Sequence, residues 1–154
     1  MTAHELLAAL PPDYRAQVQR QLDALPEGNA RGNKFHAEQC FDLLWPVLQG
    51  VKFDSKAERA FAQILAARLK AGEIVDLRIH PVYVLGPARI KYTADFTWRE
   101  AGHLVACDVK GHISERWRII RQLWRVHGPY DLRVVRRVRG RGMTVTETIR
   151  GGNR

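Results

Sequence analysis

The chain has 154 residues, of which 45% are hydrophobic and 27% are charged, a composition typical of one globular domain with an ordinary core. Its two cysteines, Cys40 and Cys107, exclude a disulfide framework and a cysteine zinc site, and they predict a reducing, cytoplasmic compartment. No apolar run is long enough to cross a bilayer and the N-terminus lacks the basic start of a signal peptide, so we expect no membrane partner.

The excess of basic residues is concentrated in one part of the chain. The 25 lysines and arginines exceed the 16 acidic residues by nine, which gives a net charge of +9. Residues 115–141 alone hold nine arginines against Glu115 and Asp131, a net charge of +7. This distribution favours an acidic polymer as partner, with nucleic acid as the leading candidate. The alternative is a solvated basic face that serves solubility.

The first 49 residues are predicted to form a helical extension. Apolar spacing predicts helices over residues 2–10, 13–25 and 35–48, and Pro46 should kink or end the third. Composition predicts a linker at residues 26–33. No catalytic pattern occurs in this extension, so we expect it to pack, to dimerise or to contact a partner.

A longer helix is predicted from Lys56 to about Ala71, where Asp54-Ser55 begins it and Gly72 ends it. At about 100° per residue, Glu58 falls within the apolar arc of this helix. A carboxylate that faces the core needs a cation or a hydrogen-bond donor, so Glu58 is a candidate functional residue. The alternative is a glutamate that interacts with the helix dipole and bends out to water.

Strand patterns occupy most of residues 74–110. Residues 74–85 are predicted to form one strand, with Pro81 at an edge or a bulge. Residues 92–98 and 103–110 are predicted to form a hairpin, because apolar and polar side chains alternate in both segments and a polar turn at 99–102 separates them.

This hairpin contains two aspartates and a lysine. If Trp98 pairs with His103, Asp95 and Asp108 are diagonal neighbours on one face, with Cβ atoms roughly 7–8 Å apart, close enough to hold one cation. Lys110 lies beside Asp108 on that face. Two carboxylates and a lysine predict a metal site, and a register shift of one residue would turn Asp108 and Lys110 away from Asp95. The alternative is a surface Asp–Lys pair beside an unrelated aspartate.

After the hairpin, a helix is predicted from about Ser114 to His127 and a strand over residues 132–138. One face of the helix is apolar, and another carries a stripe of arginines: Arg118, Arg121 and Arg125. Together with Arg136 and Arg137 of the strand, these are the candidate nucleic-acid-binding residues. Residues 139–154 are predicted to be a basic, partly flexible tail, in which residues 143–149 could add a strand.

Four blocks of the sequence, in order, resemble the PD-(D/E)XK nuclease superfamily. They are F-D-S-K-A-E (53–58), A-G-E-I-V-D-L (71–77), Y-T-A-D-F (92–96) and D-V-K-G (108–111). Within the superfamily they look like a phage and prophage family of resolvase-like endonucleases, of the Holliday junction resolvase type. Ala94 stands where the superfamily motif has its proline. The resemblance implies an α/β, restriction-endonuclease-like core of the order α-β-β-β-α-β over residues 50–138, preceded by the helical extension at 1–49.

The resemblance also implies an activity. The protein would be a Mg²⁺-dependent DNA endonuclease, with Mn²⁺ as a substitute. It would act on branched or double-stranded DNA, as a homodimer, in a bacterial host or phage-infected cell. The alternative is a non-catalytic nucleic-acid-binding module on the same scaffold.

The resemblance assigns a role to each motif residue. Asp95 and Asp108 would bind Mg²⁺, with the Val109 carbonyl as a further ligand. Glu58 would complete the metal shell directly or through water. Lys110 would orient or activate the attacking water.

Overall fold

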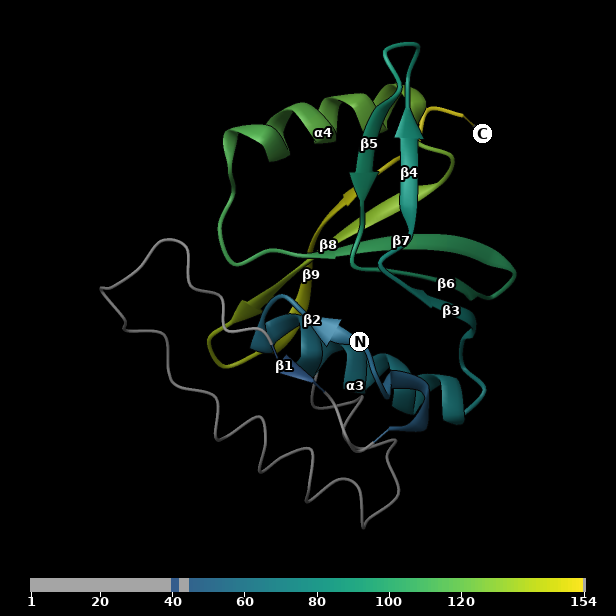
Figure 1. Cartoon of the computed structure of the whole chain (residues 1–154), viewed down its shortest axis with the longest axis vertical. Helices are drawn as coiled ribbons and strands as arrows, with labels where there is room; N and C mark the ends of the chain where they lie inside the picture. Colours follow the sequence, from purple (N-terminus) through teal and green to yellow (C-terminus); the bar gives the residue numbers. More distant parts are fainter. Residues whose placement is uncertain (1–39, 42–44, 154) are drawn as a thin grey trace. The chain divides into compact units, whose positions relative to one another are not determined.

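The computed structural model describes residues 40–41 and 45–153, and the chain divides into two compact units (Figure 1). The first unit ends at Ala67 and the second begins at Arg68, so the division falls inside a helix. The helices predicted at residues 2–10 and 13–25 and the linker at 26–33 lie outside the described residues.

Two short strands precede the helix in the first unit. Strand β1 (Cys40–Phe41) pairs antiparallel with β2 (Lys52–Phe53), and a 3-10 helix, η1 (Pro46–Leu48), lies between them in sequence. The helix predicted over residues 35–48 is therefore wrong in its described part. Pro46 has no N–H for a helix interior, and it occupies the first position of η1 instead.

The helix predicted from Lys56 to about Ala71 is confirmed as helix α3 (Lys56–Lys70). The Ser55 hydroxyl accepts the backbone N–H of Glu58 at 3.0 Å, and the Glu58 carboxylate accepts the backbone N–H of Asp54 at 3.0 Å. Reciprocal bonds of this kind are typical of a capping box, which satisfies N–H groups at the start of a helix. Gly72, with φ of 73°, follows the last turn.

The second unit is built on a five-stranded mixed sheet in the order β3-β6-β7-β8-β9. Its strands are β3 (Val75–Ile79), β6 (Phe96–Glu100), β7 (His103–Val109), β8 (Asp131–Val138) and β9 (Gly142–Ile149). All neighbours are antiparallel except β7 and β8, which are parallel and are connected through helix α4 (Glu115–His127). The protein is therefore an α/β protein with a mixed sheet and two described helices.

The strands predicted at 74–85 and 92–98 are each split in two. Between β3 and β6 the chain leaves the sheet to form a separate hairpin, β4 (Val82–Leu85) and β5 (Ile90–Thr93). A single first strand is wrong because Pro81 has no N–H for a sheet ladder and the preceding residue, His80, has φ of 53°.

Two backbone hydrogen bonds join the points where the chain leaves and re-enters the sheet. The His80 N–H donates to the Asp95 carbonyl at 2.9 Å, and the Ala94 N–H donates to the Pro81 carbonyl at 3.1 Å. These bonds hold β3 and β6 together across the inserted hairpin, so Asp95 lies at a fixed point directly before β6.

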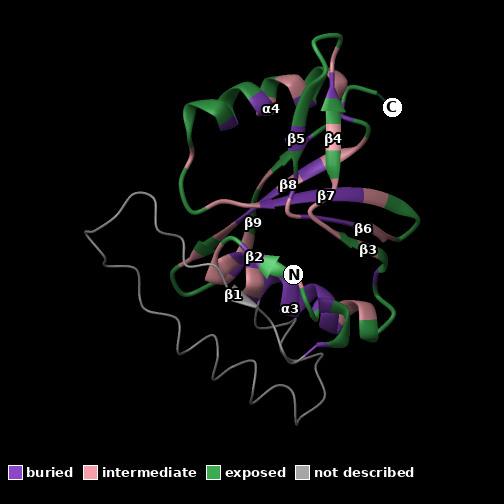
Figure 2. Ribbon diagram, viewed as in Figure 1, coloured by how far each residue is buried: buried purple, intermediate pink, exposed green. Residues whose placement is uncertain are grey.

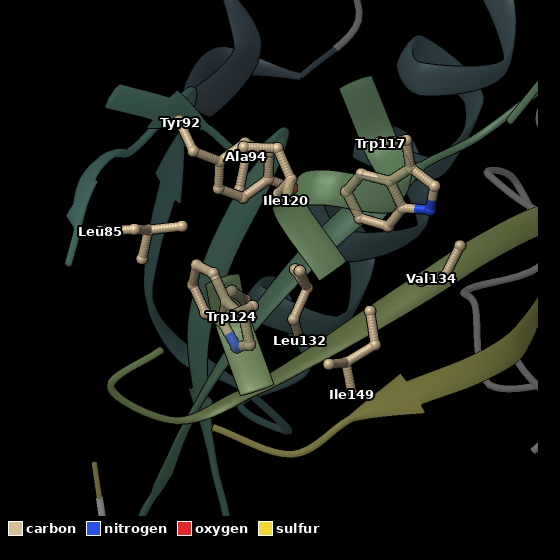
Figure 3. Close-up of a cluster of buried hydrophobic side chains, with 10 residues drawn as sticks. Leu85, Tyr92, Ala94, Trp117, Ile120, Trp124, Leu132, Val134 and Ile149 are labelled. Atoms are coloured by element: carbon tan, nitrogen blue, oxygen red, sulfur yellow. The ribbon is translucent and has the colours of Figure 1, made fainter. Parts of the chain in front are cut away.

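Helix α4 packs an aromatic face against the sheet and the inserted hairpin. Its cap is the predicted one, since the Ser114 hydroxyl accepts the Trp117 N–H at 3.2 Å. Trp117, Ile120 and Trp124 are buried in one core with residues of β4, β5, β7, β8 and β9 and with one residue between β5 and β6, Ala94 (Figure 3). The strand residues of this core are Leu85, Tyr92, Ala106, Leu132, Val134 and Ile149. Within residues 40–41 and 45–153, no helix has the length and apolar content needed to cross a membrane.

The segment predicted as a partly flexible tail contains a full strand of the sheet. Strand β9 pairs with β8 from Leu132↔Ile149 to Val138↔Gly142, with one irregularity beside Val134. The predicted strand at 143–149 is thereby confirmed, and the prediction of a tail is wrong for these residues, because Ile149 is buried in the core (Figure 3).

A charged network links the end of α3 to β6 and β8. Glu100 accepts a hydrogen bond from Arg68 and forms an ion pair with Arg133 at 2.8 Å, while Arg68 also pairs with Glu73 at 3.0 Å. Burial of Glu100 alone would raise its pKa. The hydrogen bonds and charges of Arg68 and Arg133 outweigh that burial, so the pKa of Glu100 is lower than its ordinary value.

This lowered pKa makes stability depend on pH. The contribution of Glu100 is present above the unfolded pKa of about 4.5 and is lost as pH falls through the lower folded value. We expect the melting temperature of the wild type to fall more steeply than that of Glu100→Gln between about pH 6 and pH 3. Thermal unfolding followed by circular dichroism measures this. Asp76→Asn, at an exposed position, should keep the wild-type slope, and equal slopes for wild type and Glu100→Gln would contradict the network's role.

Candidate active site

The β6–β7 hairpin turns more tightly than predicted. Glu100 pairs with His103 around a two-residue turn, Ala101-Gly102, whose φ angles of 47° and 82° suit a type I′ hairpin turn. The predicted pairing of Trp98 with His103 is therefore wrong by two residues, because Arg99 and Glu100 continue the strand. A shift of two leaves each side chain on its predicted face of the sheet.

Asp95 lies directly before β6 and bonds to β7 through its backbone and its side chain. The regular pairing of the two strands ends at Phe96↔Cys107. The Asp95 N–H donates to the Cys107 carbonyl at 3.0 Å, and Asp95 Oδ2 accepts the Val109 N–H at 2.6 Å. The Asp95 carboxylate therefore reaches the residue that follows Asp108 in β7, which makes the two aspartates a candidate cation-binding pair.

Asp108 is a buried carboxylate with two partners. It is 2% exposed, its Oδ1 lies 2.7 Å from Lys110 Nζ, and its Oδ2 accepts a hydrogen bond from the Tyr92 hydroxyl. A buried charge is costly unless it is paired and hydrogen-bonded, so both contacts stabilise Asp108 in this position. Burial, followed by the charge and the hydrogen bond of Asp108, raises the pKa of Tyr92 far above its ordinary value, so the hydroxyl stays protonated and donates.

Lys110 is held by its backbone and by an aromatic ring. Its N–H donates to the Val135 carbonyl of β8 at 2.8 Å, and its Nζ lies 4.5 Å from the centroid of the Trp117 ring in α4. This cation–π contact and the ion pair to Asp108 fix the ammonium group, while 25% of the side chain remains exposed. A substrate group could therefore reach the ammonium from solvent.

The donors at this site suit a hard divalent cation. Asp95 and Asp108 offer carboxylate oxygens, and the carbonyl of Val109 follows directly in the chain. A carboxylate has about four lone-pair positions, so an oxygen that accepts a hydrogen bond can also bind a cation. Mg²⁺ is usually held by one or two carboxylates, with water and phosphate oxygens completing its shell. No group of three or more His, Cys, Asp or Glu able to hold a metal occurs among the described residues, so the described carboxylate set is this pair.

Glu58 belongs to the first unit and is described within it. The carboxylate is 3% exposed and accepts the Asp54 N–H, so the alternative of a glutamate bent out to water is wrong. Its capping role accounts for a carboxylate at this helix position. Its membership of a metal shell stays a prediction.

Carboxylates pair with the predicted arginine stripe of α4. Arg118 lies 3.2 Å from Glu115, one turn away on the same helix. Arg121 and Arg125 both pair with Glu147 of β9, the second at 3.7 Å. The stripe therefore has less unbalanced charge to offer a phosphate backbone than the sequence predicts.

The two candidate arginines of β8 are placed differently. Arg136 donates to the Gly111 carbonyl at 3.3 Å, which ties β8 to the loop that follows Lys110. Arg137 is exposed. Among the five predicted arginines, Arg136 is the one that the structure joins to the loop of the candidate site.

Tyr92 and Trp117 support the site, and neither was assigned to it from the sequence. When residues 92–98 are taken as one strand, the Tyr92 side chain points away from the face that carries Asp95. The break at Ala94-Asp95 separates β5 from β6 and removes this alternation. A tyrosine in a strongly apolar segment needs a hydrogen-bond partner for its hydroxyl. That requirement was the feature of the sequence that could have assigned Tyr92 to the site.

Comparison with known proteins gives a family. The family model described as "Protein of unknown function (DUF1064)" matches residues 45–143, more than half of the chain. This chain is a member of the DUF1064 family. The DUF1064 match includes Asp95, Asp108 and Lys110, together with Tyr92 and Trp117. No curated protein and no solved structure matches the chain.

The contact between Tyr92 and Asp108 can be tested through stability. Tyr92→Phe keeps the ring and removes the hydroxyl, so a buried carboxylate oxygen loses its donor. We expect a loss of roughly 1–3 kcal/mol in the free energy of unfolding, measured by urea denaturation.

Tyr83→Phe is the matched control. Its hydroxyl lies in the same aromatic cluster but bonds a neutral partner, the Tyr130 hydroxyl, at 2.8 Å. We expect this control to cost about 0.5–1.5 kcal/mol. A Tyr92→Phe protein as stable as Tyr83→Phe would contradict the role given to Tyr92.

Proposed function

We propose that this protein is a divalent-cation-dependent endonuclease that hydrolyses phosphodiester bonds in DNA. The observation that carries the proposal is the group formed by Asp95, Asp108 and Lys110. The Asp95 carboxylate accepts the N–H of the residue that follows Asp108, and the Lys110 ammonium lies 2.7 Å from the buried Asp108 carboxylate. This group combines a cation-binding pair with a fixed positive charge, and both are useful in phosphodiester hydrolysis.

Each residue has a defined task in this proposal. Asp95 and Asp108 hold the cation with the Val109 carbonyl, and the Tyr92 hydroxyl keeps the Asp108 carboxylate oriented. Bound Mg²⁺ or Mn²⁺ would neutralise charge on the scissile phosphate and lower the pKa of a water molecule. Lys110 orients the attacking water and stabilises the negative charge that develops on the phosphate oxygens.

The choice of substrate rests on charge and on the sequence resemblance. The net charge of +9 favours an acidic polymer. The resolvase-like sequence blocks favour branched or double-stranded DNA, a homodimer that cuts two strands, and the cytoplasm of a bacterial host or phage-infected cell. The assignment of Glu58 to the metal shell comes from the same resemblance and is part of the proposal.

A second candidate function is a DNA-binding module without catalysis. It is favoured by the ion pair of Asp108 with Lys110, which already neutralises the buried carboxylate, and by the small number of carboxylates at the described site. It requires salt-sensitive DNA binding by the basic segment 115–141 without any metal. The two candidate functions differ in one measurable outcome: a binding module would not cleave DNA.

The proposal predicts the effect of replacing each member of the group. Asp95→Asn, Asp108→Asn and Lys110→Met should each lower the cleavage rate by about 100-fold or more, because each loses a charge that acts on the transition state. The assay follows cleavage of junction, duplex and single-stranded DNA with Mg²⁺ or Mn²⁺. The two asparagine variants should still bind DNA in EDTA.

Asp76→Asn is the control for these variants. It removes one negative charge from an exposed position of β3 and should cleave at the wild-type rate. If the wild type leaves all three DNA substrates intact with both metals, the endonuclease proposal fails and the binding module remains. Wild-type cleavage by Asp108→Asn would also defeat the endonuclease proposal as stated.

A further inference from the structure

Strands β8 and β9 extend past the other strands of the sheet as a two-stranded ribbon. Strand β7 pairs with β8 only as far as Val109↔Val135, beyond which one further bond joins the Lys110 N–H to the Val135 carbonyl. Strands β8 and β9 remain paired after that point: Arg136↔Thr144, Arg137↔Met143 and Val138↔Gly142.

A short turn closes the ribbon at Arg139-Gly140-Arg141. The Arg141 N–H donates to the Val138 carbonyl at 3.0 Å, and Gly140 has φ of 74°, as the third residue of a type II turn requires. A Cβ atom on Gly140 would meet nothing within 4 Å. The glycine is therefore required by the backbone conformation of the turn and not by close packing.

The tip of the ribbon carries positive charge without an acidic partner among residues 40–41 and 45–153. Arg137, Arg139 and Arg141 are exposed, and the turn that joins β8 to β9 is coloured as exposed in Figure 2. Residues 132–146 hold five arginines and no aspartate or glutamate. By contrast, the predicted stripe on α4, Arg118, Arg121 and Arg125, pairs with Glu115 and Glu147. The exposed arginines of the ribbon are therefore better placed to bind phosphates than this stripe.

We infer that this ribbon is a duplex-DNA-binding element that contacts phosphates through Arg137, Arg139 and Arg141. The inference deepens the proposed function and rests on DNA being its partner. Arginines without local carboxylates bind phosphates with release of condensed counterions. The major groove, about 12 Å wide, admits a two-stranded ribbon.

The ribbon starts beside the candidate active site. Val135 bonds to Lys110, and Arg136 bonds to the Gly111 carbonyl at 3.3 Å. Gly140 comes five positions after Val135 in the chain, which corresponds to roughly 17 Å of extended strand. That length spans roughly five base pairs at 3.4 Å each. A duplex bound at the tip is therefore long enough for some of its phosphates to lie near Lys110.

Binding measurements on the full chain test the inference without relying on catalysis. Affinity for a duplex of about 30 base pairs is measured by fluorescence anisotropy in EDTA at several salt concentrations. Arg139→Ala/Arg141→Ala should weaken binding roughly 50-fold at about 0.1 M salt and reduce the slope of log K against log salt by about 1.8, or 0.9 for each lost phosphate contact. Arg139→Lys/Arg141→Lys, which keeps the charge, should retain most of the affinity.

Arg78→Ala/Lys91→Ala is the control, because it removes two positive charges from exposed positions on β3 and β5. It should bind within about threefold of the wild type, since neither position lies on the ribbon. Equal losses in both double variants, no loss in the ribbon variant, or a wild type that prefers single-stranded RNA or anionic vesicles to the duplex would each overturn the inference.

Cleavage assays on the same preparations separate this inference from the proposed function. Suppose that Arg139→Ala/Arg141→Ala alone loses duplex binding and that neither the wild type nor any variant cleaves DNA. The ribbon is then supported as a DNA-binding element, and the endonuclease proposal fails. If the ribbon variant binds and cleaves like the wild type, the ribbon fails and the endonuclease proposal stands.

Discussion

The buried carboxylate of Asp108 is the constraint on which the candidate site depends. Because it is 2% exposed, it requires partners, and the fold supplies them from separate elements. The Tyr92 hydroxyl comes from the inserted β4–β5 hairpin, and the Lys110 ammonium comes from the residue that follows β7. Trp117 of α4 lies against that ammonium. The inserted hairpin, the central strand and the crossover helix therefore meet at one charged group, and the site depends on the core that surrounds it.

The sequence predicts the elements with strong periodicity and the faces of the strands, but not where strands break. Helices α3 and α4 were predicted within about one residue, because their apolar spacing and their caps, Ser55 and Ser114, agree. The side chains that share a face in each strand of the hairpin were also predicted. From these faces, Asp95 and Asp108 were predicted to be neighbours. The register was wrong by two residues because a two-residue turn and a four-residue turn fit the same polar segment. The split strands and the role of Tyr92 depend on tertiary pairing that alternation alone does not encode.

The distribution of basic charge is visible in the sequence, but its neutralisation is not. Residues 115–141 were correctly identified as the basic segment, and the amphipathic pattern of α4 drew attention to its arginines. Their partner Glu147 lies in β9, a strand that local patterns suggested only weakly. Because Glu147 pairs with two arginines of α4, the exposed arginines at the ribbon tip, Arg139 and Arg141, become the better candidates for binding phosphates. A site that holds a metal and a separate ribbon that holds DNA would then be joined through the contact of Val135 with Lys110.

The central claim is that Asp95 and Asp108 together hold one divalent cation. A Mn²⁺ titration followed by electron paramagnetic resonance tests it directly, since it needs neither a DNA substrate nor turnover. The account predicts Mn²⁺ binding by the wild type and by Asp76→Asn, competition by Mg²⁺, and loss of binding in both Asp95→Asn and Asp108→Asn. Mn²⁺ binding that is equal in the wild type, Asp95→Asn and Asp108→Asn, or absent from the wild type, would contradict it.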